Sequence, residues 1–489
     1  MSELDNSCGG LLPLIARLEP APAVRDDRRD VWLTRGELRT ASLALAEAIA
    51  SERKRLVFLF CSNSRETVVG LLAAGAAGHA VALIDPALGE DKLGSLIEGY
   101  QPDLILSTPD IGEKLREHPL AWGDWRRHES GAGVVDWAER DAAAAADIYP
   151  ALQVLLSTSG TTGSQKYVRL AREAIIANAR QIAEALAIDD GSIGVAHLPL
   201  HYSYGLSVVT SHLAAGGRVS LINDSITSPS FWSKIRTAGG SHFPGVPFHY
   251  AALARLGAGL IPNSVKVFTQ AGGALDPRIQ AKIHDWANAR DGRFFVMYGQ
   301  TEASPRMTTL QHADFARKAG SVGVALAGGR LSIVDDSGAL LPADAVGTVV
   351  YEGPNVMLGY AMSRADLDRG DEVNGRLETG DLGRLDPEGF LYLTGRAKRF
   401  AKIAGYRLGL DEIEQEFAAV SSVACIDLGE KIAVVHDQES DVALKARVRE
   451  LAANYKVPSS SFSLLRTARI PRGASGKINY AQLKESLRV

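Results

Sequence analysis

The chain has 489 residues, which at roughly 150 residues per domain predicts two to four structural units. Hydrophobic residues make up 46% and charged residues 22% of the chain, which excludes fibrous, low-complexity and mainly disordered classes. The formal net charge of −4 gives no reason to expect a nucleic-acid partner or an anionic membrane surface, so a small-molecule enzyme is the default expectation.

The cysteines and the apolar stretches bear on the compartment. The cysteines lie far apart in the sequence, at Cys8, Cys61 and Cys425. This spacing offers neither a disulfide framework nor a paired thiolate metal site, and it suits a reducing cytoplasm. Glu3 lies where a signal peptide would be basic or apolar, so export is not expected. The most apolar stretch, Val68–Ile84, contains glycines and His79 and is too short to span a bilayer, so no stable membrane insertion is expected.

The first part of the chain alternates helix and strand patterns. Thr34 to Glu37 has the spacing of a capping box, which predicts a helix over about 35–50. Leu56–Phe60 and Ala80–Ile84 are short continuous apolar runs, and residues 65–77 between them have helical character. A strand–helix–strand unit with continuous apolar strands predicts a buried, mostly parallel sheet with helices on both faces. Further strands are expected at 103–106, 153–156, 217–222 and 293–297.

The pattern changes after about residue 320 to short alternating strands at 331–334, 348–351 and 390–393, which predicts an antiparallel segment. A basic stretch at 396–402 comes next, and it could also be a solvated charged turn. The remaining residues have helix, strand and helix character at 410–419, 431–436 and 441–453. We therefore expect a large N-terminal domain over 1–397 and a small α+β domain over 398–489.

A loop rich in glycine and hydroxyl residues follows the strand at 153–156. It runs from Ser157 to Lys166 and offers backbone N–H groups, hydroxyls and one cation, which together suit a polyphosphate. It differs from a Walker A loop because the lysine follows Gln165 and precedes Tyr167. A flexible surface turn is the other interpretation.

Five motifs then follow one another along the chain: Ser157–Gly163 with Lys166, Tyr298–Glu302, Thr379–Asp381, Gly395-Arg396 with Gly405–Arg407, and Pro471–Lys477. In this order they resemble the signature motifs of the adenylate-forming superfamily, which includes acyl- and aryl-CoA synthetases, nonribosomal peptide adenylation domains and firefly luciferase. The resemblance covers Thr34 to Leu483 and is nearest to a short acyl-CoA synthetase or a stand-alone acyl-AMP ligase. It implies an α/β fold whose large N-terminal domain binds ATP and the carboxylate and whose small C-terminal domain is mobile.

The resemblance also implies roles for individual residues. Around ATP or AMP it places Ser157, Thr158, Ser159, Gly160, Thr161, Thr162, Gly163, Lys166, Gly272, Gly273, Ala274, Tyr298, Gly299, Asp381 and Arg396. It gives catalytic roles to Thr301, Glu302 and Lys477, with Glu302 as the Mg²⁺ ligand and Lys477 as the bridge between carboxylate and α-phosphate. Taken singly, Glu302 could instead be an ordinary carboxylate at a helix N-terminus, and Lys477 a solvated charge.

The remaining implied residues surround the acyl group. The carboxylate pocket would contain Tyr202, with His201 as a rival for the same place, together with Ser203, Gly245 and Val246. Ser203 lies where amino-acid-activating domains have an aspartate, and the next carboxylate along the chain is Asp224, so a plain carboxylic acid is favoured. Arg306 has two open interpretations, a contact with a second anionic group or an ion pair with a surface acid. Lys398 would be the hinge, and Gly405 would line the path of the thiol.

The predicted activity is the ATP- and Mg²⁺-dependent conversion of a small carboxylic acid to acyl-AMP with release of pyrophosphate. The acyl group then passes to a pantetheine thiol, which makes the chain an acyl- or aryl-CoA ligase. Two alternatives stay open at this point. One is an acyl-AMP ligase that loads the phosphopantetheine of an acyl carrier protein, and the other is a degenerate nucleotide-binding protein.

Overall fold

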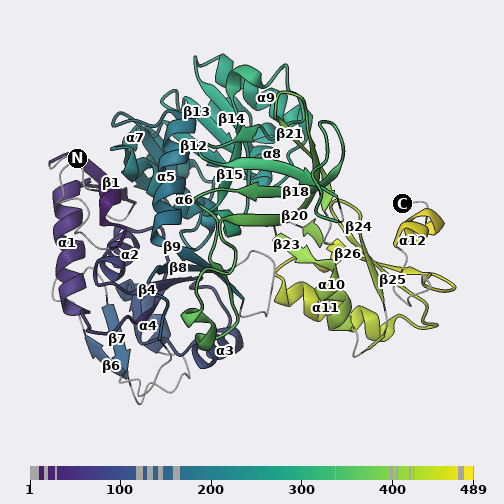
Figure 1. Cartoon of the computed structure of the whole chain (residues 1–489), viewed down its shortest axis with the longest axis horizontal. Helices are drawn as coiled ribbons and strands as arrows, with labels where there is room; N and C mark the ends of the chain where they lie inside the picture. The colour runs from purple at the N-terminus through teal and green to yellow at the C-terminus, as the bar shows by residue number, and fades with distance from the viewer. Residues whose placement is uncertain are drawn as a thin grey trace. The chain divides into compact units, whose positions relative to one another are not determined.

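The structure is a computed structural model of the chain. It describes residues 10–15, 20–27, 30–116, 125–128, 136–140, 147–157, 166–335, 337–396, 400–403, 406–417, 420–421, 423–471, 478 and 480–487. These residues form two compact units, the first ending at Gly395 and the second beginning at Arg396 (Figure 1). The roles assigned to the domains 1–397 and 398–489 stay predictions.

The first unit contains a nine-stranded sheet in the order β16-β15-β14-β13-β12-β10-β11-β1-β2. Its strands are β1 (Pro22–Asp26), β2 (Leu33–Thr34), β10 (Ile193–Ala196), β11 (Arg218–Leu221), β12 (His242–Gly245), β13 (Val267–Gln270), β14 (Arg293–Gly299), β15 (Arg306–Leu310) and β16 (Val324–Ala325). Neighbouring strands are parallel from β1 through β11, β10, β12 and β13 to β14. The strands β2, β15 and β16 are antiparallel to their neighbours at the two edges.

A second, eight-stranded sheet has the order β19-β9-β8-β4-β3-β5-β7-β6. Its strands are β3 (Leu56–Phe60), β4 (Ala80–Ile84), β5 (Leu104–Ser107), β6 (Trp125–His128), β7 (Asp136–Arg140), β8 (Leu152–Ser157), β9 (Tyr167–Ala171) and β19 (Gly359–Ala361). The central strands β8, β4, β3 and β5 are parallel. Phe58 and Phe60 join the apolar cluster on one face of β3, and Val57 and Leu59 join the cluster on the other. The continuous apolar run in the sequence therefore reflects a strand buried on both faces.

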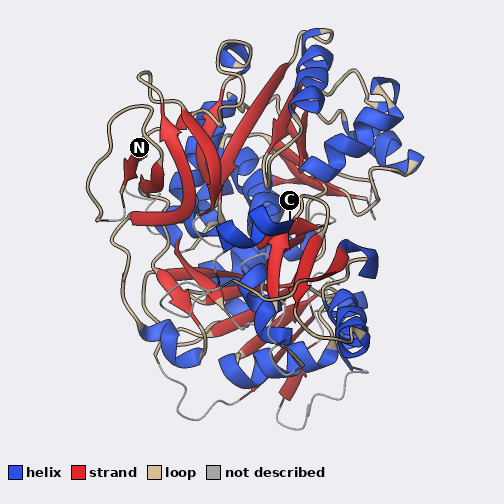
Figure 2. Ribbon diagram, turned by 90° about the vertical axis from the view of Figure 1, so that its right-hand side faces the viewer, coloured by secondary structure: helices blue, strands red, loops and turns tan. Residues whose placement is uncertain are grey.

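Helices lie between and outside the two sheets (Figure 2). Between them are α1 (Arg35–Ala48), α2 (Arg65–Ala76), α5 (Arg172–Leu186) and α6 (Ser203–Ala214). Helix α2 packs against β3, β4 and β5 of one sheet and β1 of the other. The apolar clusters on the outer faces include residues of α3 (Glu90–Tyr100), α4 (Pro109–Arg116), α7 (Pro229–Ala238), α8 (Pro247–Leu256) and α9 (Pro277–Asn288). The predicted α/β class with helices on both faces is confirmed.

Local sequence signals account for several element boundaries. Helix α1 begins after Thr34, whose Oγ1 accepts from the Glu37 N–H at 3.1 Å while the Thr34 N–H donates to the Glu37 carboxylate at 2.8 Å. The predicted capping box is therefore present. The apolar stretch Val68–Ile84 is divided between α2 and β4, and among the described helices none is long and apolar enough to cross a membrane.

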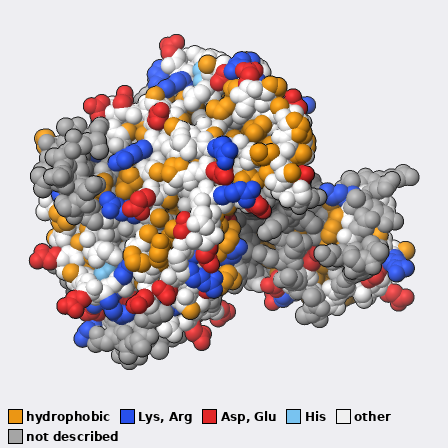
Figure 3. Space-filling model, in the orientation of Figure 1, with side chains coloured by type: hydrophobic (Ala, Val, Ile, Leu, Met, Phe, Trp, Pro, Cys, Tyr) orange, Lys and Arg blue, Asp and Glu red, His pale blue; other side chains and the backbone are white. Residues whose placement is uncertain are grey.

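The predicted antiparallel segment is a four-stranded sheet of the first unit. It contains β17 (Arg330–Val334), β18 (Gly347–Glu352), β20 (Arg376–Leu385) and β21 (Leu391–Arg396). Strand β18 pairs antiparallel with both β17 and β20. On the face of the first unit drawn in Figure 3, the described acidic and basic side chains are interspersed, without the single-sign patch that nucleic-acid binding favours.

The second unit is α+β. A hairpin of β22 (Phe400–Ile403) and β23 (Tyr406–Gly409) precedes a three-stranded sheet of β24 (Ala424–Asp427), β25 (Ile432–His436) and β26 (Phe462–Arg466). Its helices are α10 (Leu410–Phe417), α11 (Val442–Asn454) and α12 (Tyr480–Leu487). Buried residues of α10, α11 and β25 share one apolar cluster, so this unit has its own core.

Candidate functional site

The predicted site residues of the first unit gather at the carboxyl ends of β12, β13 and β14. Gly245 of β12 lies beside Gln270 of β13, which in turn lies beside Val296 of β14. The segments that leave these strands contain the predicted residues Val246, Gly272 to Ala274, and Thr301 with Glu302. Ligands of open α/β sheets bind outside the carboxyl ends of parallel strands, so the topology supports a binding site here.

Glu302 and Lys166 come together through a residue that the sequence did not single out. The Tyr360 hydroxyl donates to Glu302 Oε1 at 2.9 Å, and Lys166 Nζ lies 3.4 Å from the centroid of the Tyr360 ring. Burial raises the pKa of Tyr360, and the neighbouring Glu302 carboxylate adds to this rise, so the hydroxyl stays a donor. The antiparallel pairing of β19 with β9 puts Ala361 opposite Tyr167 and so brings Tyr360 to the end of the phosphate loop.

The predicted adenine and ribose residues also touch each other. The Tyr298 hydroxyl donates to Asp381 Oδ2 at 2.5 Å, and both side chains are largely buried. The Asp381 N–H donates to Thr379 Oγ1, which itself donates to the Val349 carbonyl. The Thr-Gly-Asp segment therefore lies at an irregularity in the pairing of β20 with β18, and it presents a carboxylate beside the aromatic ring of Tyr298 on β14.

The glycine loop after β13 lies against the predicted carboxylate pocket. Gly272 has φ +80°, and a Cβ atom there would lie 2.7 Å from the Tyr202 hydroxyl and 3.3 Å from Val246 Cγ1. The Gln270 side-chain amide donates to the Gly273 carbonyl at 2.6 Å and holds the loop in place. The absence of a side chain at Gly272 therefore lets the loop approach both pocket residues.

The start of α6 contributes the other predicted pocket residues. The hydroxyl oxygens of Ser203 and Thr301 are 3.1 Å apart, within hydrogen-bond distance. His201 Nε2 lies 3.9 Å from Asp85 Oδ2, at the end of β4. The sequence did not reveal this carboxylate because Asp85 and His201 are far apart along the chain, although a polar residue directly after a buried strand is a usable signal. A Cβ atom at Gly245 would meet the Tyr250 ring at 2.4 Å, so that glycine also serves the packing of α8 on β12.

Part of the predicted site lies in segments outside those that the structure describes. Outside the described residues are Thr158, Ser159, Gly160, Thr161, Thr162, Gly163, Lys398, Gly405, Lys477 and the side chain of Arg396. Of their neighbours, Ser157 is the exposed last residue of β8, and Gly299 is the last residue of β14.

The donor set around Glu302 fits a Mg²⁺ ion that is shared with a nucleotide. Among the residues that the structure describes, no group of three or more His, Cys, Asp or Glu side chains would hold a metal on its own. Mg²⁺ is usually held by one or two carboxylates together with substrate phosphates. Glu302 supplies one half-buried carboxylate, and Tyr360 contacts both this carboxylate and the Lys166 ammonium. The site therefore suits a magnesium–ATP complex better than a permanent metal centre.

Comparison with known proteins agrees with this geometry. A model of AMP-binding enzymes matches residues 15–361. The chain belongs to the AMP-binding enzyme family. It is 26% identical to 2-succinylbenzoate–CoA ligase of Enterococcus faecalis over 461 residues, 88% of each chain. It is 27% identical to sulfoacetate–CoA ligase of Cupriavidus necator over 484 residues, 92% of each chain.

Solved structures share the fold. A double mutant of o-succinylbenzoate CoA synthetase from Bacillus subtilis, bound with its product analogue OSB-NCoA, superposes with a TM-score of 0.75 at 24% identity and 98% coverage of both chains. The family match confirms the resemblance to the adenylate-forming superfamily that was inferred from the order of the motifs. As a member of this family, the chain is an AMP-forming acid–thiol ligase that uses ATP and Mg²⁺.

Proposed function

We propose that this ligase activates a plain carboxylic acid at the carboxyl ends of β12, β13 and β14. The observation that carries this assignment is the contact of Tyr360 with both Lys166 and Glu302, which puts a cation and a carboxylate together where the triphosphate and its Mg²⁺ would bind. Tyr298 and Asp381 would hold the nucleoside, with the aspartate accepting the ribose hydroxyls.

In the first step a carboxylate oxygen of the substrate attacks the α-phosphorus of ATP, and the bond to the pyrophosphate oxygen breaks. Mg²⁺, when bound, neutralises charge on the triphosphate. The chain's own residues supply position: Glu302 and Lys166 at the phosphates, and Tyr202, Ser203 and Val246 at the acid. In the second step a thiol attacks the acyl carbon, AMP leaves, and the thiol proton is released.

The small domain would supply Lys477 for the first step. By analogy with the family, we propose that it bridges the two reacting anions, which offsets their repulsion. Rotation at Lys398 would then remove it, and Gly405 would leave room for the thiol. The acceptor could be CoA or the phosphopantetheine of a carrier protein, because the same path serves both.

A plain acid is favoured over an α-amino acid because of the partner of Ser203. The Ser203 hydroxyl lies within hydrogen-bond distance of the Thr301 hydroxyl, and neither side chain offers a carboxylate to an ammonium group. Asp85 lies 3.9 Å from His201 Nε2, so the comparison of amino acids with plain acids below also tests Asp85 as an ammonium partner. A cytoplasmic location stays a prediction from the sequence.

ATP–pyrophosphate exchange tests the proposal, with fatty, aryl, hydroxy and amino acids offered one at a time and the thiol omitted. Exchange with one class of plain acid is expected, and Glu302→Gln should abolish it. Exchange with amino acids alone would overturn the interpretation of Ser203. ATP binding without acid-dependent exchange would instead favour a degenerate nucleotide-binding protein. Supplying CoA and a holo carrier protein separately then identifies the acceptor.

A further inference from the structure

Arg306 is held rigidly inside the first unit. It is the first residue of β15 and is 2% exposed. Its backbone N–H donates to Asn178 Oδ1 at 3.0 Å, and its carbonyl accepts from Asn178 Nδ2 at 2.8 Å and from Asn355 Nδ2 at 2.9 Å. Both asparagines are fully buried. The direction of the Arg306 side chain is therefore fixed by the surrounding structure.

The guanidinium has no negatively charged partner among the described residues. Its Nη1 donates to Met297 Sδ at 3.2 Å, and its carbon lies 4.6 Å from the centroid of the Tyr204 ring. Its Nε–H is buried and has no hydrogen-bond partner. Burial raises the pKa of Tyr204 to about 12, so this tyrosine stays neutral. The interpretation of Arg306 as half of a surface ion pair is wrong, because the side chain is buried and has no acidic partner among the described residues.

An unpaired buried charge is expensive. An arginine has five N–H donors and stays protonated, and burying an ion without a partner of opposite charge is strongly destabilising. An apolar residue of similar length would avoid this cost and would still pack against Tyr204 and Met297. A ligand that supplies the missing negative charge explains why the arginine is there.

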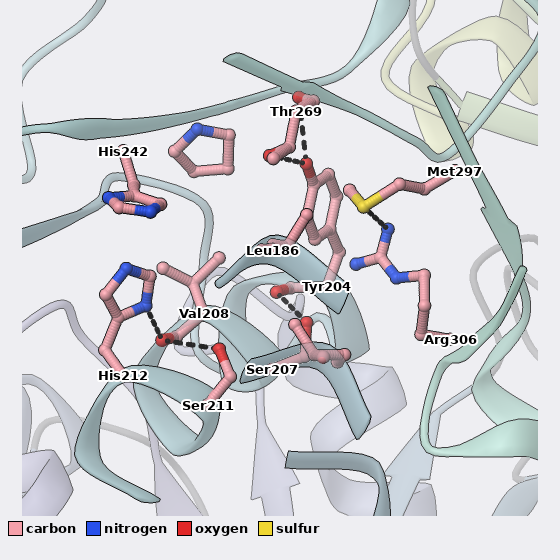
Figure 4. Close-up of a pocket in the computed structure, with 12 residues that line it drawn as sticks. Leu186, Tyr204, Ser207, Val208, Ser211, His212, His242, Thr269, Met297 and Arg306 are labelled. Atoms are coloured by element: carbon pink, nitrogen blue, oxygen red, sulfur yellow. Dashed lines mark hydrogen bonds between the residues drawn. The ribbon is translucent and has the colours of Figure 1, made fainter. Parts of the chain in front are cut away.

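Arg306 lines a cavity that Figure 4 shows in close-up. The polar residues around it are Tyr204, Ser207, Ser211, His212, His242 and Thr269. Burial lowers the pKa of His212 to about 4 and lowers that of His242 as well, so both rings are neutral near pH 7. Among the described lining residues the only full charge is therefore the positive one of Arg306. The cavity is small, about 20 Å³, which is room for one or two water molecules.

The cavity adjoins the proposed acid pocket. The Tyr204 ring lies 6.3 Å from the ring of Tyr202, and both belong to the start of α6. Thr269, which lies within hydrogen-bond distance of the Tyr204 hydroxyl, is followed on the chain by the loop that carries Gly272. Met297 Sδ holds the place beside Nη1 that an anionic oxygen would take, and its unbranched side chain can move aside. An acid that enters past Tyr202 would thus point its far end at Arg306.

We propose that Arg306 binds a second anionic group of the substrate, so that the acid activated by this ligase is a dianion, such as a dicarboxylate or a sulfonated carboxylate. This inference rests on the proposed function, because it assigns the far end of the same acid pocket. A single buried guanidinium matches one carboxylate or sulfonate and rejects an uncharged tail, which would leave the charge unpaired.

Matched pairs of acids test this specificity. ATP–pyrophosphate exchange is measured with glutarate against pentanoate, sulfoacetate against propanoate, and 2-succinylbenzoate against 4-oxo-4-phenylbutanoate. The wild type should prefer the dianion of at least one pair by about 100-fold in kcat/KM, since truncating one partner of a buried charge pair costs this much or more. Arg306→Met should lose that preference and keep or gain activity on the monoacid, and Arg306→Lys should restore part of it. Arg330→Met, which removes an exposed arginine far along the chain, is the charge-matched control.

The outcomes separate the two proposals. A wild type that prefers monoacids throughout overturns the role of Arg306 and leaves the ligase activity standing. If no acid supports exchange, the proposed plain-acid activity fails, and calorimetric binding of the same dianions to wild type and Arg306→Met decides the inference. Binding that depends on Arg306 upholds the anion site, whereas binding that is equal in both proteins, or absent from both, overturns it. Circular dichroism and thermal unfolding of each variant exclude misfolding as the cause.

Discussion

Tyr360→Phe isolates the contact that holds Glu302 in place. The substitution removes the hydroxyl that donates to Glu302 Oε1 at 2.9 Å and keeps the ring beneath Lys166. A hydrogen bond to a charged group contributes about 1.5–3 kcal/mol, which corresponds to a factor of roughly 10 to 150 in an equilibrium constant. Because the carboxylate would lose its orientation, we expect the Mg²⁺ concentration for half-maximal ATP–pyrophosphate exchange to rise by about 10- to 100-fold.

Tyr100→Phe is the matched control. Its hydroxyl donates at 2.8 Å to the carbonyl of Ala361, the residue after Tyr360, so the control removes a hydroxyl that supports the same strand. We expect it to lower the free energy of unfolding by about 1 kcal/mol and to leave the Mg²⁺ dependence unchanged. The reasoning is refuted if Tyr360→Phe lowers stability to a similar extent and has the same Mg²⁺ dependence as Tyr100→Phe.

Three further predictions concern the catalytic lysine, the glycine loop and pH. Lys477→Ala should lose most adenylate formation yet retain thiol transfer from preformed acyl-AMP, and equal loss in both half-reactions would contradict the two-conformation mechanism. Gly272→Ala should lower the free energy of unfolding by about 1–2 kcal/mol, because alanine disfavours the left-handed φ of this position. It should also raise KM for the acid, because the added Cβ would lie 2.7 Å from the Tyr202 hydroxyl. Gly328 has φ +74° and no atom within 4 Å of an added Cβ, so Gly328→Ala should lower the free energy of unfolding and leave KM for the acid unchanged. The pKa of His212 is lowered to about 4 by burial, so the unfolded chain binds the extra proton first, and stability should fall as pH drops from about 6.5 towards 4. His212→Asn should reduce the slope of the free energy of unfolding against pH, measured by urea titration, by up to about 1.4 kcal/mol per pH unit. An unchanged slope would contradict the assignment of this pH dependence to His212.

The sequence alone determined the elements that depend on neighbours in the chain. The capping box at Thr34 and Glu37 marks the start of α1 because its hydrogen bonds join residues of one turn. The apolar runs at Leu56–Phe60 and Ala80–Ile84 coincide with β3 and β4 because a strand buried on both faces has no polar alternation. The order of the motifs was enough to name the superfamily and its cofactors.

The tertiary structure decided which distant residues meet. Tyr360 belongs to none of the sequence motifs. It reaches Glu302 and Lys166 because β19 pairs antiparallel with β9. Asp85 comes near His201 although the two belong to different segments of the α/β unit. Arg306 had two interpretations in the sequence, since a charge that follows a motif can face water or the core. Its burial against Tyr204 depends on how β15 packs beside α5 and α6, and only the folded chain fixes that packing.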